Sequence, residues 1–482
     1  MNINAKNGII YALASIISQL INLFLVPLYT KNLSTIEVGR YNLATSIQSL
    51  LTILIVLGIS ASFIRFYNDL KDKKVLKSTT IIFIILTTMI CFAFLVLGGA
   101  SFGTNIFDGS QGKAYMYLVV ANASLTAILN IVVIDARMQM KALRSSLILI
   151  SEVSIRVMIG IYCIYVLKGD GLCLIISQII SSSIVLLIIF LKNIRNISFG
   201  FNKQYIKTML PYGLGLLIGD LSTWILNLID RYFLKAMSGL SQVAVYSTAS
   251  KIGLLIDPVF IQPFRNVYTP IKFSIYKEKN AKDVIRKYFD IYCCIGWFCI
   301  LGLGVGANIF IQILATPEYE EAVYIIPIIA FSYFLWGLVQ FYSLGLHINK
   351  KTLLNSMISN VAAIVNIVLN IILIPKFNGY GAAVATCLSY AISNCAYNYF
   401  GNKEFDSGLR VLDWCKLGFV VMPLYALYKV IMMFSLNMFF EIVLIVFIII
   451  LYCVIVMKMN YIPKEYIQIF TDRVKGILKR GR

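Results

Sequence analysis

Charged side chains occur inside long apolar stretches of this 482-residue sequence, where an unpaired charge is costly, so each is a functional candidate. The candidates for contact with a substrate are Arg65, Arg156, Lys251 and Arg265, and the candidates for coupling to a proton or a sodium ion are Asp220 and Asp257. Asp220 is alternatively the partner of a cation such as Lys251. Asp257 precedes Pro258, and proline kinks or breaks a helix, so this pair predicts a broken helix with ionisable groups at membrane depth.

The other charged candidates also have a structural interpretation. Arg65 and Arg265 stand near the ends of their apolar stretches, where a long cation can reach lipid headgroups. Glu152 lies four residues before Arg156, which is the favourable order for an ion pair on one helix, so these two charges can neutralise each other. The sequence leaves both interpretations open for each residue.

Four polar residues recur at helical spacing in a later apolar stretch. Asn355, Ser359, Asn366 and Asn370 fall on one face of a helix. Such a face either hydrogen-bonds a neighbouring helix or lines a hydrated cavity for sugar hydroxyls. Asn366 and Asn370 are therefore further candidates for contact with a substrate.

The apolar stretches are long enough to cross a membrane. The sequence is 59% hydrophobic and 13% charged, whereas soluble domains have roughly 25% charged residues. A spanning helix needs about 20 apolar residues. We predict an all-helical integral membrane protein with about fourteen spans, at residues 9–29, 41–66, 78–100, 114–134, 147–167, 172–191, 209–234, 243–271, 288–314, 324–346, 353–374, 381–400, 417–433 and 438–457. The second and eighth spans are rich in glycine and polar residues.

Basic residues follow every second predicted span. They gather in the segments 71–77, 137–144, 192–207, 272–287, 350–351, 403–416 and 458–482. Since lysine and arginine accumulate on the cytoplasmic side, both termini are expected in the cytoplasm. The net charge of +20 therefore reflects orientation in a membrane and predicts no nucleic-acid partner.

The sequence has few features of an enzyme or of a metal-binding protein. No segment outside the predicted spans is large enough to fold as a catalytic domain. The ten cysteines lie within or beside apolar stretches, and His347 is the single histidine. These residues lack the spacing of metal sites and disulfide frameworks. We therefore expect neither an enzyme nor a metal centre nor another cofactor.

Two pairs of segments about two hundred residues apart resemble each other. Residues 33–46 match 240–250, and 169–172 match 379–382. Duplicated halves are typical of transporters, in which two helical bundles surround a cleft near the membrane midplane. We predict pseudo-symmetric six-helix lobes at 1–200 and 201–405, followed by two helices and a basic cytoplasmic tail in 406–482. Arg65 and Arg265, in matching spans, are expected to face the cleft.

Several motifs resemble those of bacterial polysaccharide flippases. They are Leu33-Ser34, Val38-Gly39-Arg40-Tyr41, Leu57-Gly58-Ile59 and Arg65-Phe66-Tyr67, then Asp230-Arg231-Tyr232-Phe233-Leu234, Val245-Tyr246-Ser247, Lys251-Ile252-Gly253 and Gly379-Tyr380-Gly381-Ala382-Ala383. Val38 stands where the family usually has an aromatic residue. The motifs cover both halves in the family's order and spacing. That family belongs to the multidrug/oligosaccharidyl-lipid/polysaccharide exporter superfamily.

The resemblance implies a flippase for undecaprenyl-diphosphate-linked oligosaccharides in the bacterial inner membrane, serving O-antigen, capsule or similar polymers. It implies a central cationic cavity, and Arg65 and Lys251 match family motif positions. Arginine offers a planar fork of donors that suits the diphosphate. The implied partners are the lipid-linked glycan, membrane lipids, and the polysaccharide polymerase and chain-length machinery. Transport by rocking lobes would draw on proton or sodium binding at Asp220 or Asp257.

Two other function classes remain open. A drug or metabolite exporter of the same superfamily should have an acidic cavity, whereas cations outnumber acids in the spans of the first half. A membrane polysaccharide polymerase needs a carboxylate cluster for acid–base chemistry. Glu318, Glu320 and Glu321 are the one acidic group in a loop that is available to such an enzyme.

Overall fold

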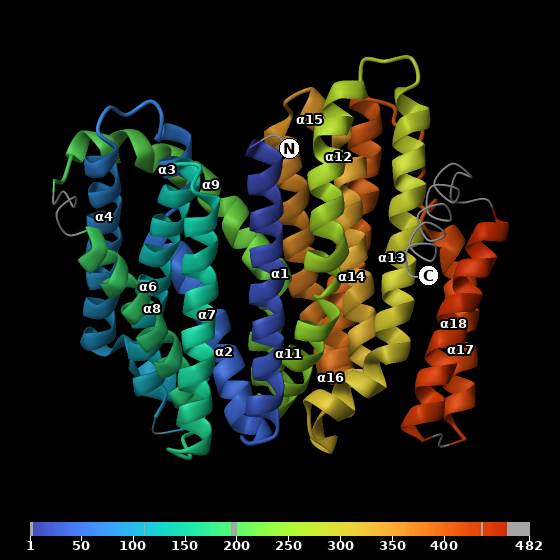
Figure 1. Ribbon diagram of the computed structural model, residues 1–482, viewed down its shortest axis with the longest axis horizontal. Coiled ribbons are helices and arrows are strands. Elements are labelled where there is room, and N and C mark those ends of the chain that lie inside the picture. Colours follow the sequence, from blue (N-terminus) through green and yellow to red (C-terminus); the bar gives the residue numbers. More distant parts are fainter. Residues whose placement is uncertain (1–2, 110, 194–199, 435–436, 460–482) are drawn as a thin grey trace, which may run out of the picture. The chain divides into compact units, whose positions relative to one another are not determined.

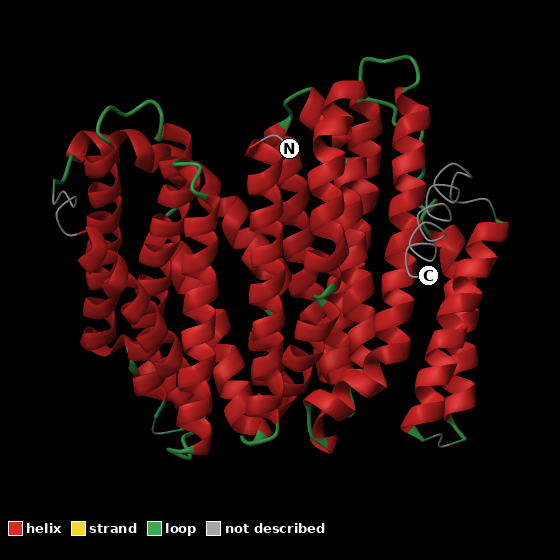
Figure 2. Ribbon diagram, viewed as in Figure 1, coloured by secondary structure: helices red, strands yellow, loops and turns green. Residues whose placement is uncertain are grey.

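The computed structural model describes residues 3–109, 111–193, 200–434 and 437–459. Within these ranges the chain forms helices joined by loops and turns, with no strand (Figure 2). The predicted all-helical fold is thus confirmed. Most of the predicted basic tail, residues 460–482, lies outside the described residues.

The chain divides into two compact units. Unit 1 comprises residues 1–248, 313–319 and 363–385, and unit 2 comprises the remainder. The helices that begin in unit 1 before residue 248 are α1 (Ile3–Thr30), α2 (Thr35–Val56), α3 (Ile59–Phe66), α4 (Lys73–Phe94), the π-helical η1 (Leu95–Gly99), α5 (Ser101–Ile106), α6 (Gly112–Met138), α7 (Ala142–Tyr165), α8 (Gly171–Asn193), α9 (Lys203–Leu228), α10 (Asp230–Ser238) and α11 (Leu240–Gly253). In this unit α7 packs against α1 and α8, and α6 packs against α2, α4 and α8 (Figure 1).

The later helices, except the short η4, belong wholly or partly to unit 2. They are the π-helical η3 (Asp257–Ile261), α12 (Gln262–Ile275), α13 (Ala281–Leu314), the 3-10 turn η4 (Pro317–Tyr319, in unit 1), α14 (Ala322–Tyr342), α15 (Leu344–Ile348), α16 (Thr352–Glu404), α17 (Cys415–Met432) and α18 (Met438–Lys458). The last two helices pack against each other as a pair (Figure 1). The predicted domain boundaries stay a prediction.

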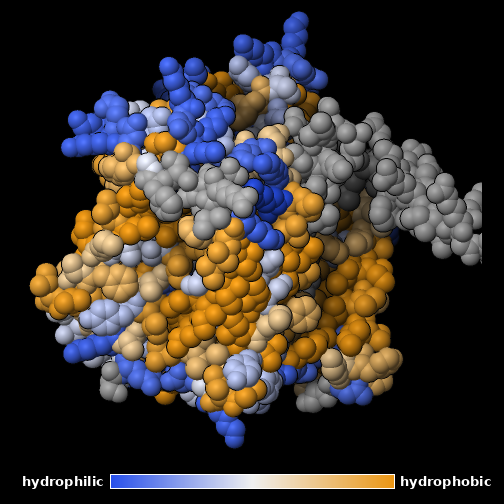
Figure 3. All heavy atoms as spheres, turned by 60° about the vertical axis from the view of Figure 1, so that its left-hand side comes forward, coloured by the Kyte–Doolittle hydropathy of each residue, from blue (hydrophilic) through white to orange (hydrophobic). Residues whose placement is uncertain are grey.

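Many helices are suited to a lipid environment. Among the described residues, eleven helices are long and apolar enough to cross a membrane, or twelve if α2 and α3 form one bent span. Apolar side chains such as Leu97, which is 87% exposed, cover their outer faces. In Figure 3 hydrophobic side chains cover the middle of the helices, and hydrophilic ones gather near the ends. The chain is a multi-pass membrane protein; the count of fourteen and the orientation stay predictions.

Polar side chains at the helix starts explain where several helices begin. The hydroxyl of Ser34 accepts a hydrogen bond from the backbone N–H of Glu37 at the start of α2 (3.3 Å). Asp72 and Asn202 accept in the same way at the starts of α4 and α9. Such caps satisfy N–H groups that have no partner within the helix. The polar residues between apolar stretches therefore set the helix boundaries.

The second predicted span is broken. Leu57 (φ 48°) and Gly58 (φ 71°) adopt left-handed backbone conformations between α2 and α3, and the two helices meet at an angle of 50°. A Cβ atom on Gly58 would lie 2.1 Å from the carbonyl oxygen of Gly213 on α9. Glycine is therefore required here for both its backbone conformation and its lack of a side chain.

The eighth predicted span is irregular at the predicted position. α11 ends at Gly253, and a π-helical turn runs from Asp257 to Ile261 before α12 begins. Pro258, buried at the second position of this turn, lacks the N–H that an α-helix would use. The α-helix is irregular at this proline as predicted, but Leu240–Ile275 remains one continuous span and is not broken in two.

α16 contains two predicted spans. At 53 residues a straight helix would measure about 80 Å, far beyond the ~30 Å hydrocarbon core. Asn378 interrupts it with a non-helical conformation (φ 48°, ψ −128°). The Tyr397 hydroxyl bonds the Ser359 hydroxyl (2.7 Å) and the Asn355 carbonyl (3.0 Å), so the chain folds back on itself.

Candidate functional site

Two of the predicted cations, Arg65 and Arg156, lie in unit 1, and Arg156 is the more buried of them. Its guanidinium donates to the side chain of Asn22 on α1 (2.9 Å) and lies 3.7 Å from the Glu152 carboxylate. The Ser181 hydroxyl donates to the same carboxylate (3.1 Å). The predicted Glu152–Arg156 pair is therefore present. The Nε atom of Arg156 is nevertheless buried without a hydrogen-bond partner, so the pair leaves one donor of the guanidinium unused.

A chain of neutral polar side chains crosses the interior of unit 1 beside this pair. Gln178 on α8 donates to the Tyr41 hydroxyl (2.9 Å), and Asn122 on α6 donates to Gln178 (2.6 Å) and to Gln48 on α2 (2.8 Å). Inside a membrane such hydrogen bonds hold helices together. Sequence reasoning missed this group, although single amides within apolar stretches were a visible signal.

Arg65 and Asp220 lie at exposed positions of unit 1. The Arg65 side chain is 54% exposed and forms an ion pair with Asp69 (2.7 Å), and its guanidinium lies 5.3 Å from the centre of the Phe66 ring. Asp220 is exposed on α9. A role in substrate contact or ion coupling stays a prediction for both residues.

Lys251, Asp257 and Arg265 belong to unit 2 and follow one another along α11, η3 and α12. Lys251 and Asp257 are partly buried, and the Oδ1 atom of Asp257 is buried without a hydrogen-bond partner. The Arg265 guanidinium stacks over the ring of Trp336 on α14, 5.0 Å from its centre. Cation–π contacts of this kind orient a guanidinium without using its N–H donors.

The two predicted asparagines are fully buried in the unit 1 part of α16. Asn370 donates to the side-chain oxygen of Asn366 (3.0 Å), and the Asn370 side-chain oxygen has no hydrogen-bond partner. Their shared helical face is confirmed. Asn355 and Ser359, which extend the stripe, contact Tyr397 within unit 2. Ser359 therefore uses its side chain in helix association, whereas Asn355 contributes only its backbone carbonyl and its side-chain oxygen has no hydrogen-bond partner.

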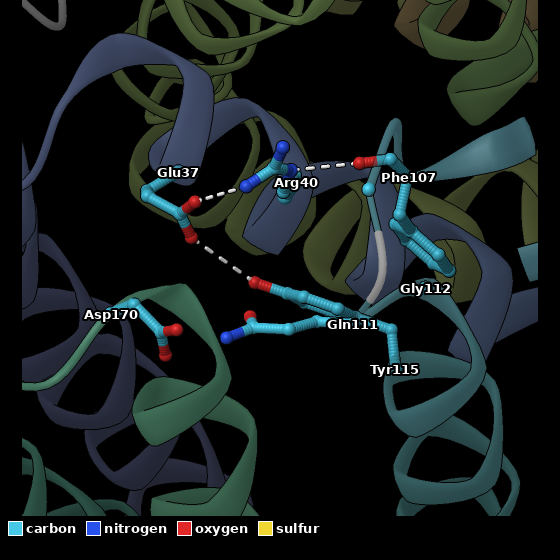
Figure 4. Close-up of a pocket in the computed structure, with 8 residues that line it drawn as sticks. Glu37, Arg40, Phe107, Gln111, Gly112, Tyr115 and Asp170 are labelled. Carbon is cyan, nitrogen blue, oxygen red and sulfur yellow. Dashed lines mark hydrogen bonds and ion pairs between the residues drawn. The ribbon is translucent and has the colours of Figure 1, made fainter. Parts of the chain in front are cut away.

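A pocket of about 260 Å³ lies at one end of unit 1 (Figure 4). Its lining comes from the start of α2, the segment between α5 and α6, and the start of α8, and consists of Glu37, Arg40, Phe107, Gly109, Gln111, Gly112, Tyr115 and Asp170. In Figure 4 the Gln111 and Asp170 side chains point into the space below the Glu37 carboxylate. Sequence reasoning placed Arg40 in a family motif but did not foresee a pocket.

Glu37 holds this end of unit 1 together. Its carboxylate pairs with Arg40 and accepts hydrogen bonds from the Tyr115 hydroxyl (3.4 Å) and the Gly171 backbone N–H (3.1 Å). Arg40 in turn donates to the carbonyl oxygens of Phe107 (2.7 Å) and Asp108 (2.5 Å). The motif at the start of α2 therefore joins three segments that are far apart in the sequence.

The described residues contain no group of three or more histidine, cysteine or acidic side chains placed to hold a metal ion. The polar side chains described above are cations, carboxylates and amides, many of them paired, on apolar helices. Such an arrangement suits recognition of a polar group that crosses a membrane.

The comparisons with known proteins agree with this picture. Residues 4–276, more than half of the chain, match the family described as polysaccharide biosynthesis protein. An uncharacterised membrane protein of Methanocaldococcus jannaschii is 24% identical over 84% of this chain and 84% of its own length. The capsular polysaccharide biosynthesis protein CapF of Staphylococcus aureus is 25% identical over 83% of this chain and its full length (100%).

Solved structures show the same fold. The lipid II flippase MurJ in an inward closed conformation superimposes with a TM-score of 0.72 at 15% identity, over 93% of this chain and 98% of MurJ. A multidrug resistance MATE family transporter of the MOP superfamily gives a TM-score of 0.59 at 13% identity, over 80% of this chain and 94% of the transporter. The predicted membership in a family of polysaccharide biosynthesis proteins is confirmed by the family match. The chain belongs to the polysaccharide biosynthesis protein family and has the fold of MOP-superfamily transporters.

Proposed function

We propose that the protein is a flippase that moves undecaprenyl-diphosphate-linked oligosaccharide repeat units from the inner to the outer leaflet for surface polysaccharide biosynthesis. Family membership supports a role in polysaccharide biosynthesis. The superfamily fold supports transport across a membrane by alternating access of two repeated halves.

The observation that carries this proposal is the incompletely bonded guanidinium of Arg156. A buried donor without an acceptor is unfavourable, and Glu152 leaves the Nε atom of Arg156 unused. A phosphate oxygen is a fitting acceptor, because arginine can offer it two parallel N–H groups. Arg65, Lys251 and Arg265 are the further cations that we propose for the diphosphate.

The remaining predicted residues have proposed roles of other kinds. The unpaired side-chain oxygen of Asn370 suits a sugar hydroxyl, which can donate to it, and Asn366 holds that amide in place. Asp220 and Asp257 are proposed to bind a coupling proton or sodium ion. The unpartnered Oδ1 atom of Asp257 supports this role.

The proposal is tested by deleting the gene and finding the leaflet in which the prenyl-linked glycan accumulates. A flippase defect leaves complete repeat units on the cytoplasmic face. Unpolymerised repeats on the outer face would instead indicate a polymerase, and normal surface polymer would favour export of a drug or metabolite.

Two single variants refine the test in the same strain. We expect Arg65→Ala and Arg265→Ala each to reduce surface polymer while the protein still inserts into the membrane. Wild-type polymer levels with both variants would remove these two cations from the mechanism.

A further inference from the structure

A buried lysine lies seven residues after Arg265 on the same helix. Lys272 of α12 is only 4% exposed. Its ammonium donates one hydrogen bond, to the backbone carbonyl of Gln340 on α14 (3.0 Å), and no described carboxylate lies within 4.0 Å of it. An ammonium removed from water needs a counter-charge or several hydrogen bonds. Lysine has three N–H donors, so two of them remain available here.

Two neighbouring side chains are also unsatisfied. The Tyr268 hydroxyl and both amide atoms of Gln340 are buried without hydrogen-bond partners, and these residues are 0% and 8% exposed. The Lys272 nitrogen lies 5.9 Å from the centre of the Tyr268 ring. That ring packs at a tilt against the ring of Phe341, with 4.5 Å between the ring centres, and Phe341 is the residue after Gln340. Buried polar groups are almost always hydrogen-bonded. Three unsatisfied side chains in one place therefore indicate a ligand.

The unused groups define the chemistry of that ligand. Lys272 offers two N–H donors, Tyr268 one O–H donor, and Gln340 two N–H donors against one acceptor oxygen. A site that is rich in donors and carries a positive charge fits an anion with several acceptor oxygens. A phosphate group has these properties.

Arg265 extends the site along the same two helices. Seven residues of α-helix span about 10 Å and bring Arg265 and Lys272 to the same face of α12. Arg265 stacks over Trp336, which lies one helical turn before Gln340 on α14. Its guanidinium makes no hydrogen bond or ion pair with any described residue. Two long cationic side chains at this spacing can contact the two phosphoryl groups of a diphosphate.

We propose that Lys272, Tyr268 and Gln340 form a phosphate-binding site in unit 2, and that this site holds a lipid-linked diphosphate together with Arg265. The identity of the ligand as a lipid-linked diphosphate rests on the proposed function, whereas the anion site rests on the unsatisfied groups. Lys272 begins the basic segment 272–287, which is predicted to be cytoplasmic. The site would therefore meet the substrate on the side from which it is taken up.

The binding test uses the full-length protein in a neutral detergent, titrated with inorganic pyrophosphate in a calorimeter. We expect the wild type to bind and Lys272→Met to bind about tenfold or more weakly, because a hydrogen bond to a charged group is lost. Lys272→Arg should retain binding, since it keeps the charge. Gln340→Leu and Tyr268→Phe should each weaken binding without removing a charge, which keeps the test decisive if Lys272→Met folds poorly.

Lys277→Met is the matched control. It removes the same charge from the same segment, but Lys277 is exposed and lies over the Tyr276 ring (5.5 Å). Binding by this variant should equal that of the wild type. Absence of pyrophosphate binding by the wild type, or equal binding by Lys272→Met and Lys277→Met, would overturn the site.

A second titration distinguishes the sources of the phosphate. Undecaprenyl diphosphate should displace pyrophosphate at lower concentration than phosphatidylglycerol does. The reverse order would assign the site to ordinary anionic lipid and would overturn the proposal that it binds a lipid-linked diphosphate. Transport of the lipid-linked glycan is measured separately, so a wild type that binds pyrophosphate but moves no glycan would refute the proposed function and leave the anion site standing.

Discussion

At the residue scale, Arg156 shows what the sequence could and could not predict. The four-residue spacing from Glu152 predicted the ion pair, because residues at this spacing are neighbours on a helix. The unused Nε donor depends on Asn22, which approaches from α1. A contact between helices so far apart in the sequence cannot be deduced from local spacing.

The role of Arg156 is tested by three variants on one helix. Arg156→Ala should lower surface polymer about tenfold or more, because hydrogen bonds to a charged group contribute roughly 1.5–3 kcal/mol. Arg156→Lys keeps the positive charge but loses the planar pair of guanidinium N–H donors, so it should give an intermediate amount of surface polymer. Arg144→Ala, at the start of α7, is the control and should have little effect. Equal polymer in all three would place Arg156 outside the substrate path.

Asp413 gives a prediction about pH. It precedes α17, and its carboxylate accepts from Arg286 on α13 (2.5 Å) and from the Arg410 backbone N–H (3.0 Å). Burial raises the pKa of this carboxyl, but the Arg410 hydrogen bond and the Arg286 contact outweigh burial and leave the pKa below its ordinary value of 3.8. The carboxylate therefore stabilises the folded protein above about pH 3.8, and this stabilisation is lost as the pH falls through the folded-state pKa.

Thermal unfolding in detergent measures this effect. Asp413→Asn should unfold at a lower temperature than the wild type at pH 7, and the difference should shrink toward pH 3. Arg286→Met should cause a similar loss at pH 7, with little further loss in the double variant. A difference between Asp413→Asn and the wild type that is independent of pH would contradict the assignment.

At the scale of elements, the sequence indicated that the second and eighth predicted spans are irregular. It indicated only part of the reason for each irregularity. Pro258 predicted the irregular turn after α11, because proline lacks the backbone N–H that a regular helix uses. The break at Gly58 depends on the close approach of Gly213 from α9. The composition of the second and eighth predicted spans, which are rich in glycine and polar residues, indicated that they are unusual. The position of each bend depends on tertiary packing, which the composition does not give.

Gly58→Ala tests the break between α2 and α3. A left-handed residue with a Cβ atom costs about 1–2 kcal/mol, and the Cβ would also collide with the Gly213 carbonyl. We expect a lower unfolding temperature in detergent and less folded protein in the membrane. Gly215→Ala is the control, because a Cβ there meets nothing within 4 Å. Equal stability of the two variants would show that α3 does not depend on this contact.

Glu441 anchors the pair formed by α17 and α18, and sequence reasoning missed it. The carboxylate is 1% exposed and accepts hydrogen bonds from Asn308 on α13 (3.0 Å) and the Tyr428 hydroxyl (2.8 Å). Glu441→Leu would leave both donors unpaired at about 1–3 kcal/mol each. The unfolding temperature should fall clearly, and less so for Glu441→Gln, which retains an acceptor. A Glu441→Leu variant as stable as the wild type would contradict this role.

At the scale of the whole molecule, apolar stretches and motif order sufficed to predict the fold and the family. The hydrophobic runs predicted the all-helical membrane protein because each can cross a bilayer only as a helix. The substrate residues are harder to predict, since they lie on separate helices. The structure shows unsatisfied groups at Arg156, Asp257 and Asn370, all of which the sequence had singled out, and adds the Lys272 group, which it had not.

The orientation predicted from the basic segments is tested with reporter fusions. A fluorescent protein that folds only in the cytoplasm should be active after residue 482 and within 272–287. Alkaline phosphatase, which is active only outside the cytoplasm, should be active after residues 34 and 318. Activity of either reporter on the opposite side would invert the predicted uptake side of the Lys272 site.

Reconstitution shows whether this chain carries a diphosphate-linked glycan across the bilayer. The purified protein is placed in vesicles that contain the lipid-linked glycan extracted from the deletion strain, and the fraction of glycan accessible to an added glycosidase is followed over time. We predict that the accessible fraction rises from one leaflet's share to nearly all with the wild type, and much more slowly with Arg156→Ala. An unchanged fraction with the folded wild-type protein would contradict the account.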